Sequence, residues 1–91
     1  MKAKIISHAY KVEAWYGRWV IVEPHYEEEL QFAVSTAVDS MDKISTMREG
    51  LFRKRPLIGA KVAILDLSTG GFIKEWEQII FGTWVEKTNA H

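Results

Sequence analysis

One stretch of helical periodicity lies between two strand-like stretches, and this arrangement limits the possible folds more than any other feature. Apolar residues recur at spacings of three and four from Leu30 to Ile44, the pattern of a helix with one buried face. The flanking residues are rich in β-branched and aromatic side chains, which favour strands. A helix framed by strands in a chain of 91 residues predicts a single α+β domain over residues 1–91.

We expect this helix to cover residues 25–49. Pro24 suits its start, because the N–H that proline lacks would be unpaired in the first turn. Gly50 is a natural stop, with Arg48 in the last turn. A break near Asp39–Ser40 is the alternative, since both residues are good N-caps. The predicted apolar stripe consists of Leu30, Ala33, Val34, Ala37, Val38, Met41 and Ile44.

Residues 4–23 predict a hairpin of two strands. Ile6, Tyr10, Val12 and Ala14 share one parity, as alternating positions on one face of a strand do. The segment Trp19–Val22 is aromatic and β-branched, which also favours a strand. Gly17 accepts positive φ without steric cost and therefore indicates the turn.

The second half of the chain predicts a connector over 51–59 and then a strand over 61–67, central because it is apolar on both faces. Residues 72–85 fit either a strand or, over 73–81, a short helix. The pair Gly70–Gly71 favours the strand, because glycines start helices poorly. The expected fold is an antiparallel sheet of about four strands packed against one long amphipathic helix in the order β-β-α-β-β, with a short extra C-terminal element as the alternative.

Residues suited to catalysis or metal binding do not form a recognisable pattern in this sequence. The chain has no cysteine, which excludes disulfides and thiolate sites. His8, His25 and His91 are too far apart in sequence to indicate a metal site. The segment Ser68–Gly71 follows a strand and predicts a hairpin turn, since such a loop holds phosphate only where a helix follows. We therefore expect a protein that is not an enzyme and uses no cofactor or metal.

No apolar stretch is long enough to suggest a membrane segment or a signal peptide. The longest purely apolar runs are Trp19–Val22 and Val62–Leu65, against the roughly 20 residues that a membrane helix requires. Residues 5–8 are too polar for the apolar core of a signal peptide. We expect a cytoplasmic protein that does not bind membranes.

Acidic and basic residues lie in different parts of the sequence, although the net charge of the chain is zero. Residues 24–42 hold five acidic and no basic side chains, and residues 43–61 hold six basic and one acidic. The helix dipole favours acids at its start and bases at its end, but Arg53, Lys54 and Arg55 lie beyond the expected helix. With Arg48 they form a candidate binding cluster for an acidic protein or for nucleic acid. A solvated basic loop is the alternative.

Aromatic residues near Gly17 form a second candidate surface, because tryptophan, tyrosine and arginine dominate interface hot spots. Phe32 faces away from the apolar stripe of the helix and suggests a contact with a second chain, including a homodimer. Packing of the tryptophans on the helix is the alternative. The candidate residues are Trp15, Tyr16, Arg18 and Trp19.

Together these features predict a small non-catalytic protein-interaction module of the adaptor or inhibitor type. Compact proteins of this kind are common among accessory proteins of phages and mobile elements. The alternative is a nucleic-acid-binding protein that uses the basic connector over residues 48–61.

Overall fold

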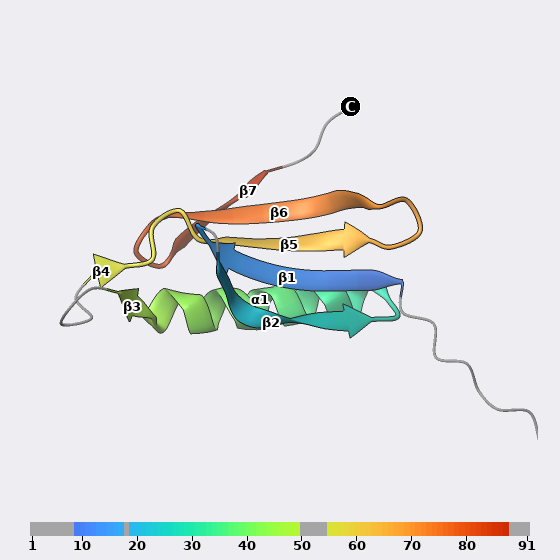
Figure 1. Ribbon diagram of the computed structural model, residues 1–91, viewed down its shortest axis with the longest axis horizontal. Coiled ribbons are helices and arrows are strands. Elements are labelled where there is room, and N and C mark those ends of the chain that lie inside the picture. Colours follow the sequence, from blue (N-terminus) through green and yellow to red (C-terminus); the bar gives the residue numbers. More distant parts are fainter. Residues whose placement is uncertain (1–8, 18, 50–54, 88–91) are drawn as a thin grey trace, which may run out of the picture.

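A helix packs on one face of a five-stranded antiparallel sheet in the computed structural model, which describes residues 9–17, 19–49 and 55–87 (Figure 1). The helix is α1 (Leu30–Thr46), and the strand order in the sheet is β2-β1-β5-β6-β7. A separate ladder joins β3 (Arg48–Glu49) to β4 (Arg55–Pro56). The strands of the main sheet are β1 (Tyr10–Tyr16), β2 (Trp19–Glu27), β5 (Lys61–Asp66), β6 (Gly71–Ile80) and β7 (Thr83–Lys87).

The core lies between the helix and the inner face of β1, β5 and β6. Along β1, Val12 and Ala14 are buried, and Glu13 between them faces the other side of the sheet. The helix contributes small side chains, including Ala33 and Ala37, which allow its backbone to approach the sheet closely. The buried apolar cluster is Val12, Ala14, Ala33, Ala37, Met41, Ile44, Leu57, Ala60, Val62, Ile64 and Trp76.

The predicted class, α+β with an antiparallel sheet packed on a helix, is confirmed, and so are several of its elements. Gly17 lies in the β1–β2 turn with φ of 64°. Strand β5 corresponds to the predicted 61–67 strand and occupies the centre of the sheet. Ile6 lies outside the described residues, so its predicted place in the first strand stays a prediction.

The prediction for the helix start was wrong. Pro24 lies within β2, and α1 begins at Leu30. Strand β2 is at the edge of the sheet, and its register with β1 shifts between Val12 and Ala14. An edge strand with a bulge accommodates proline, because the missing N–H is not needed for the ladder there.

The helix also ends earlier than expected and buries a narrower face. The chain becomes extended at Met47, the C-cap, and enters β3. Leu30 and Val38 are exposed, although both were predicted in the buried stripe. No break occurs near Asp39–Ser40: the Ser40 hydroxyl donates to the Thr36 carbonyl within a continuous helix.

The four-strand count was also wrong, because residues 72–85 do not form one strand. They contribute to a hairpin in which β6 turns into β7 at Phe81–Gly82. Gly82 has φ of 74° and belongs to this turn. The alternative helix over 73–81 is excluded, and the suggested short C-terminal element is β7.

The helix leaves part of the sheet uncovered. Helix α1 packs on β1, β2 and β5, and in Figure 1 it passes behind β1 and β2. The hairpin β6–β7 touches the end of the helix, where the Trp84 indole N–H donates to the Ser45 hydroxyl at 2.8 Å. The end of α1, the β4–β5 loop and the β6–β7 turn therefore meet at one end of the molecule.

Candidate functional site

The predicted aromatic tip of the first hairpin is divided between the two faces of the sheet. Tyr16 packs against the core on the helix side. Trp15 lies on the open face, where its ring centroid is 6.2 Å from that of Phe72. Ala63 is fully buried although it belongs to the opposite side of β5 from the core cluster. We infer that the Trp15 and Phe72 rings cover this alanine, which gives Trp15 a packing role.

The other predicted aromatic candidates do not join Trp15 in one patch. Arg18 lies outside the described residues, and the backbone of Trp19 pairs with Tyr16 in the β1–β2 ladder. Phe32 is 51% exposed on α1, and the helix covers the face opposite to Trp15. A combined Trp15–Phe32 surface is therefore absent from the described part of the chain.

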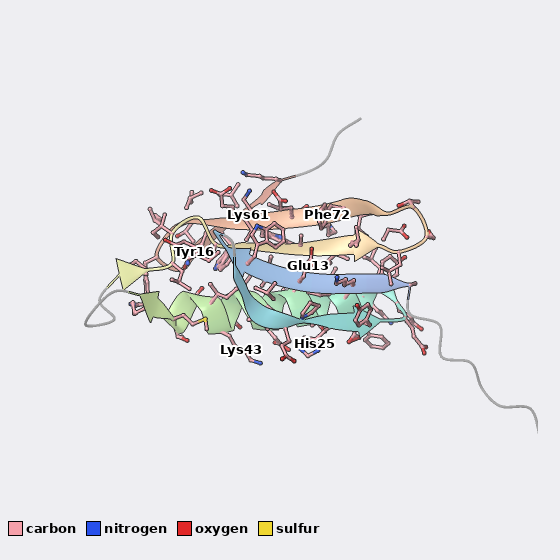
Figure 2. The ribbon with its side chains drawn as sticks, in the orientation of Figure 1. Glu13, Tyr16, His25, Lys43, Lys61 and Phe72 are labelled. Atoms are coloured by element: carbon pink, nitrogen blue, oxygen red, sulfur yellow. The ribbon has the colours of Figure 1, made fainter. Side chains whose placement is uncertain are left out.

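The open face of the sheet carries balanced charge. Lys87 and Glu77 form an ion pair of 2.6 Å, and Lys11 and Glu13 one of 3.4 Å. The ion pair with Lys87 lowers the pKa of Glu77 and raises the pKa of Lys87. Lys61 comes from the neighbouring strand (Figure 2). Alternating charges that already pair with one another do not favour a polyanion, because phosphate binding requires an excess of cations.

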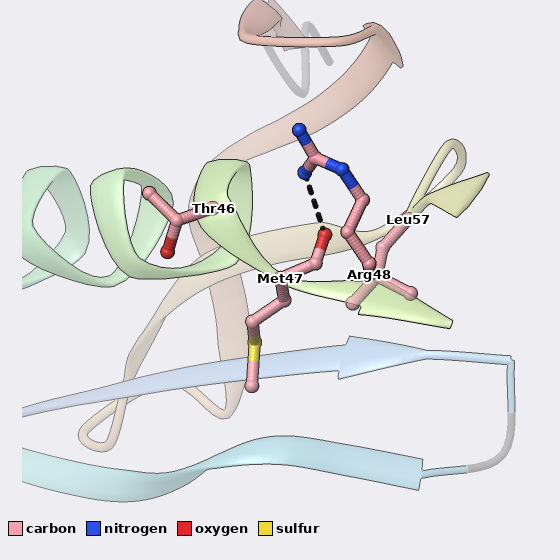
Figure 3. A pocket seen from close by; sticks show the side chains of 4 residues that line it. All are labelled: Thr46, Met47, Arg48 and Leu57. Carbon is pink, nitrogen blue, oxygen red and sulfur yellow. Dashed lines mark hydrogen bonds between the residues drawn. The ribbon is translucent and has the colours of Figure 1, made fainter. Parts of the chain in front are cut away.

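Of the predicted basic cluster, Arg48 is the residue whose side chain the structure describes. Its Nη1 donates to the Ser45 carbonyl at 3.1 Å and to the Met47 carbonyl at 2.9 Å (Figure 3). Its guanidinium also lies 4.0 Å from the centroid of the Phe81 ring. Arg48 thus satisfies carbonyls at the end of α1, where positive charge suits the helix dipole, and joins the helix to the β6–β7 turn.

The rest of the basic cluster is only partly placed. Arg53 and Lys54 lie outside the described residues. Arg55 belongs to β4, where its backbone pairs with Glu49, so residues 49 and 55 are neighbours in space. By sequence, residues 50–55 hold three cations, which are Arg53, Lys54 and Arg55, and no acid.

Exposed apolar residues at the same end of the molecule form a surface that the sequence analysis missed. Ile80 is 61% exposed and Phe81 is 53% exposed. Ile58 is also exposed; the Gly59 N–H donates to the Gln78 carbonyl and the Gln78 N–H to the Ala60 carbonyl, which brings the β4–β5 loop alongside β6. The sequence signal was present: Ile79, Ile80 and Phe81 are consecutive, and a strand that is covered on one face buries only alternate residues.

A buried glutamine holds the two loops that carry these apolar residues. The Gln78 side chain is fully buried. Its Nε2 donates to the Leu57 carbonyl at 2.8 Å, and its Oε1 accepts the Gly82 N–H at 2.9 Å. Both ends of the amide are therefore satisfied, and the loop before β5 is linked to the β6–β7 turn.

A pocket of about 430 Å³ opens beside Arg48, which contacts Phe81. It is lined by Thr46, Met47, Arg48 and Leu57 (Figure 3). The side chains of Met47 and Arg48 point in opposite directions from the chain that leaves the helix. We call the combined region the end surface. It consists of Met47, Arg48, Leu57, Ile58, Ile80 and Phe81.

The turn at Ser68–Gly71 is the predicted hairpin turn, since β6 begins directly at Gly71. The Asp66 Oδ1 accepts both the Ser68 hydroxyl and the Ser68 N–H. These bonds lower the pKa of the Asp66 carboxyl. The donors at Ser68 are thus directed to a carboxylate of the chain itself, and the helix that a phosphate loop requires does not follow.

Comparison of the chain with family models, curated proteins and solved structures found no match. Within the described ranges, no set of three or more histidine, aspartate or glutamate side chains is placed to hold a metal ion. The one helix in those ranges is neither long nor apolar enough to cross a membrane. The local geometry of the end surface is therefore the basis for a functional proposal.

Proposed function

We propose that the protein is a cytoplasmic, non-catalytic protein-interaction module of the adaptor or inhibitor type, and that it docks partners through the end surface. The observation that carries the proposal is the exposure of Ile80, at the end of β6, and of Phe81, in a turn that is held in place. Clustered apolar side chains left in water mark interaction sites more often than scattered ones do.

Rigidity supports the same proposal. Gln78 links both loops, and Arg48 stacks on Phe81 while it binds the end of the helix. A surface that is already ordered loses less conformational entropy when a partner binds. The apolar area is thus presented in one arrangement, as a specific docking site requires.

Nucleic-acid binding through residues 48–61 is the second candidate, favoured by the five basic and one acidic side chains in that range. It predicts that binding decreases steeply with salt, because phosphate contacts release counterions. An apolar interface predicts a weaker salt dependence. The Arg53→Glu/Arg55→Glu variant would remove nucleic-acid binding and leave Phe81 in place.

Replacing Phe81 with serine is expected to remove partner binding. Phe81 and Phe32 are almost equally exposed, at 53% and 51%, and lie about 20 Å apart along the direction of the helix. Phe32→Ser is therefore a matched control for the loss of one exposed ring. The measurement is quantitative affinity capture from nuclease-treated lysate of the native host, with wild type and both variants at equal concentration.

We expect proteins captured by wild type to decrease at least about tenfold with Phe81→Ser, the loss of a hot-spot residue, and to remain with Phe32→Ser. The opposite pattern, loss with Phe32→Ser alone, would place the interface on the helix and favour the homodimer. Binding that disappears after nuclease treatment would favour the nucleic-acid candidate.

A further inference from the structure

We infer that the end surface recognises an acidic protein segment in which a carboxylate side chain lies beside apolar ones. This inference rests on the proposed function and specifies the chemistry of the partner. It follows from three observations: a cation with unused donors, apolar groups beside it, and an excess of basic residues in the sequence over residues 48–61.

Arg48 supplies the cation. Both hydrogen bonds that its side chain makes come from Nη1. A guanidinium has five N–H donors, so the Nε–Nη2 edge is available to a ligand. Among the described side chains, no carboxylate forms an ion pair with Arg48. The two bonds from Nη1 and the contact with the Phe81 ring, 4.0 Å from the guanidinium carbon to the ring centroid, hold the side chain in place. A planar guanidinium fork binds a carboxylate through two parallel hydrogen bonds.

Apolar groups lie beside this cation. Met47 and Leu57 line the adjacent pocket, although the Met47 side chain points away from that of Arg48 (Figure 3). The exposed Phe81 ring lies against the guanidinium, and Ile80, which precedes it in the chain, is also exposed. The volume of about 430 Å³ is near the lower end of the range of ligand pockets, about 300–1,000 Å³. It suits one or two side chains of a partner, with the remainder of the segment lying across Ile58 and Ile80.

Charge favours an acidic partner and the exposed apolar side chains favour protein. Residues 48–61 hold five basic and one acidic side chain by sequence, an excess that suits an acidic segment better than a basic one. Isoleucine side chains gain little from a phosphate backbone, and one face of Phe81 is covered by the guanidinium, which leaves it less suited to stacking with bases.

The test is selection of random dodecapeptides displayed on phage against immobilised wild-type protein, with removal of peptides that also bind the Phe81→Ser variant. The expected peptides share an aspartate or glutamate within two positions of a leucine, isoleucine or phenylalanine. Replacing that acid by its amide should weaken binding of the peptide to wild type about tenfold, as the loss of a charged hydrogen bond predicts. The same replacement should change binding of the peptide to the Arg48→Gln variant by less than about twofold, because this variant lacks the charge that pairs with the acid.

The acid-to-amide comparison is made on the wild-type protein, so it stands even if Arg48→Gln fails to fold. Selected peptides that are basic or purely apolar, or amides that bind as tightly as acids, would overturn the inference. Binding of a single-stranded oligonucleotide that the Phe81→Ser variant also loses, with no peptide selected, would do the same in favour of nucleic acid. If Phe81→Ser loses its captured partners while the peptides show no acidic preference, the inference fails and the proposed function remains.

Discussion

Replacing Trp76 with alanine is expected to lower the free energy of unfolding by about 3–5 kcal/mol, the range for removing a large aromatic side chain from a core. Trp76 is 9% exposed and belongs to the buried cluster beneath the helix. On β5 it pairs with Val62, and on β7 with Glu86, so the cavity would open near the middle of the sheet. Urea denaturation followed by far-ultraviolet circular dichroism measures the loss.

Trp15→Ala is the matched control, because it removes the same side chain from the open face, where Trp15 is half-buried. We expect a smaller loss of stability than for Trp76→Ala. Equal losses would mean that the open face is as well packed as the core. An unchanged urea midpoint for Trp76→Ala would contradict the described core.

The second large effect is expected at Gln78. Gln78→Ala removes the buried amide and leaves the Leu57 carbonyl without its donor, which we expect to cost about 2–4 kcal/mol from the unpaired group and the cavity together. The β6–β7 turn also loses the bond to the Gly82 N–H, so partner binding should weaken although Phe81 is intact. Urea denaturation and the affinity capture described above measure the two effects.

Gln78→Glu separates hydrogen bonding from volume and adds a pH dependence. The carboxylate cannot donate to the Leu57 carbonyl, whereas the protonated acid can. Burial and this carbonyl raise the folded-state pKa of the new carboxyl above its unfolded value. The variant should therefore be most stable at low pH, relative to wild type, and lose stability as the pH rises through the folded-state pKa. A constant difference from wild type between pH 4 and 8 would contradict the burial of this side chain beside the Leu57 carbonyl.

The sequence predicted those parts of the fold that local patterns determine. Alternation along residues 10–14 places Val12 and Ala14 in the core, and Gly17 locates the first turn. The apolar character of residues 61–67 places β5 centrally. Each of these inferences depends on neighbours within a few positions, because the periodicity of a strand or helix is a local property.

Features that depend on pairing between distant segments were not predicted. Pro24 is compatible with a helix start and with a bulged edge strand, and only the position of β2 in the sheet decides between them. The β6–β7 hairpin was missed because Phe81–Gly82 is a weak turn signal after an apolar run that continues the strand pattern.

The candidate site was likewise predicted only in the part that local sequence determines. The sequence identified Arg48 from its charge, but its contacts with Phe81 and with the end of the helix join residues far apart in the chain. Ile80 and Phe81 were assigned to a strand, where alternate residues are buried, and their exposure follows from the turn that they enter. The consecutive apolar residues 79–81 indicated that part of this run is exposed, but only the fold shows which of these side chains lie in water.

The most direct test of the docking surface is site-specific photocrosslinking in the native host, with benzoylphenylalanine placed at position 81 or, as the control, at position 32. The account predicts a discrete adduct from position 81 that contains a different protein and resists nuclease, and no such adduct from position 32. Adducts from position 32 alone, or an adduct from position 81 with the mass of two copies of this chain, would contradict the assignment of the end surface to a separate protein partner.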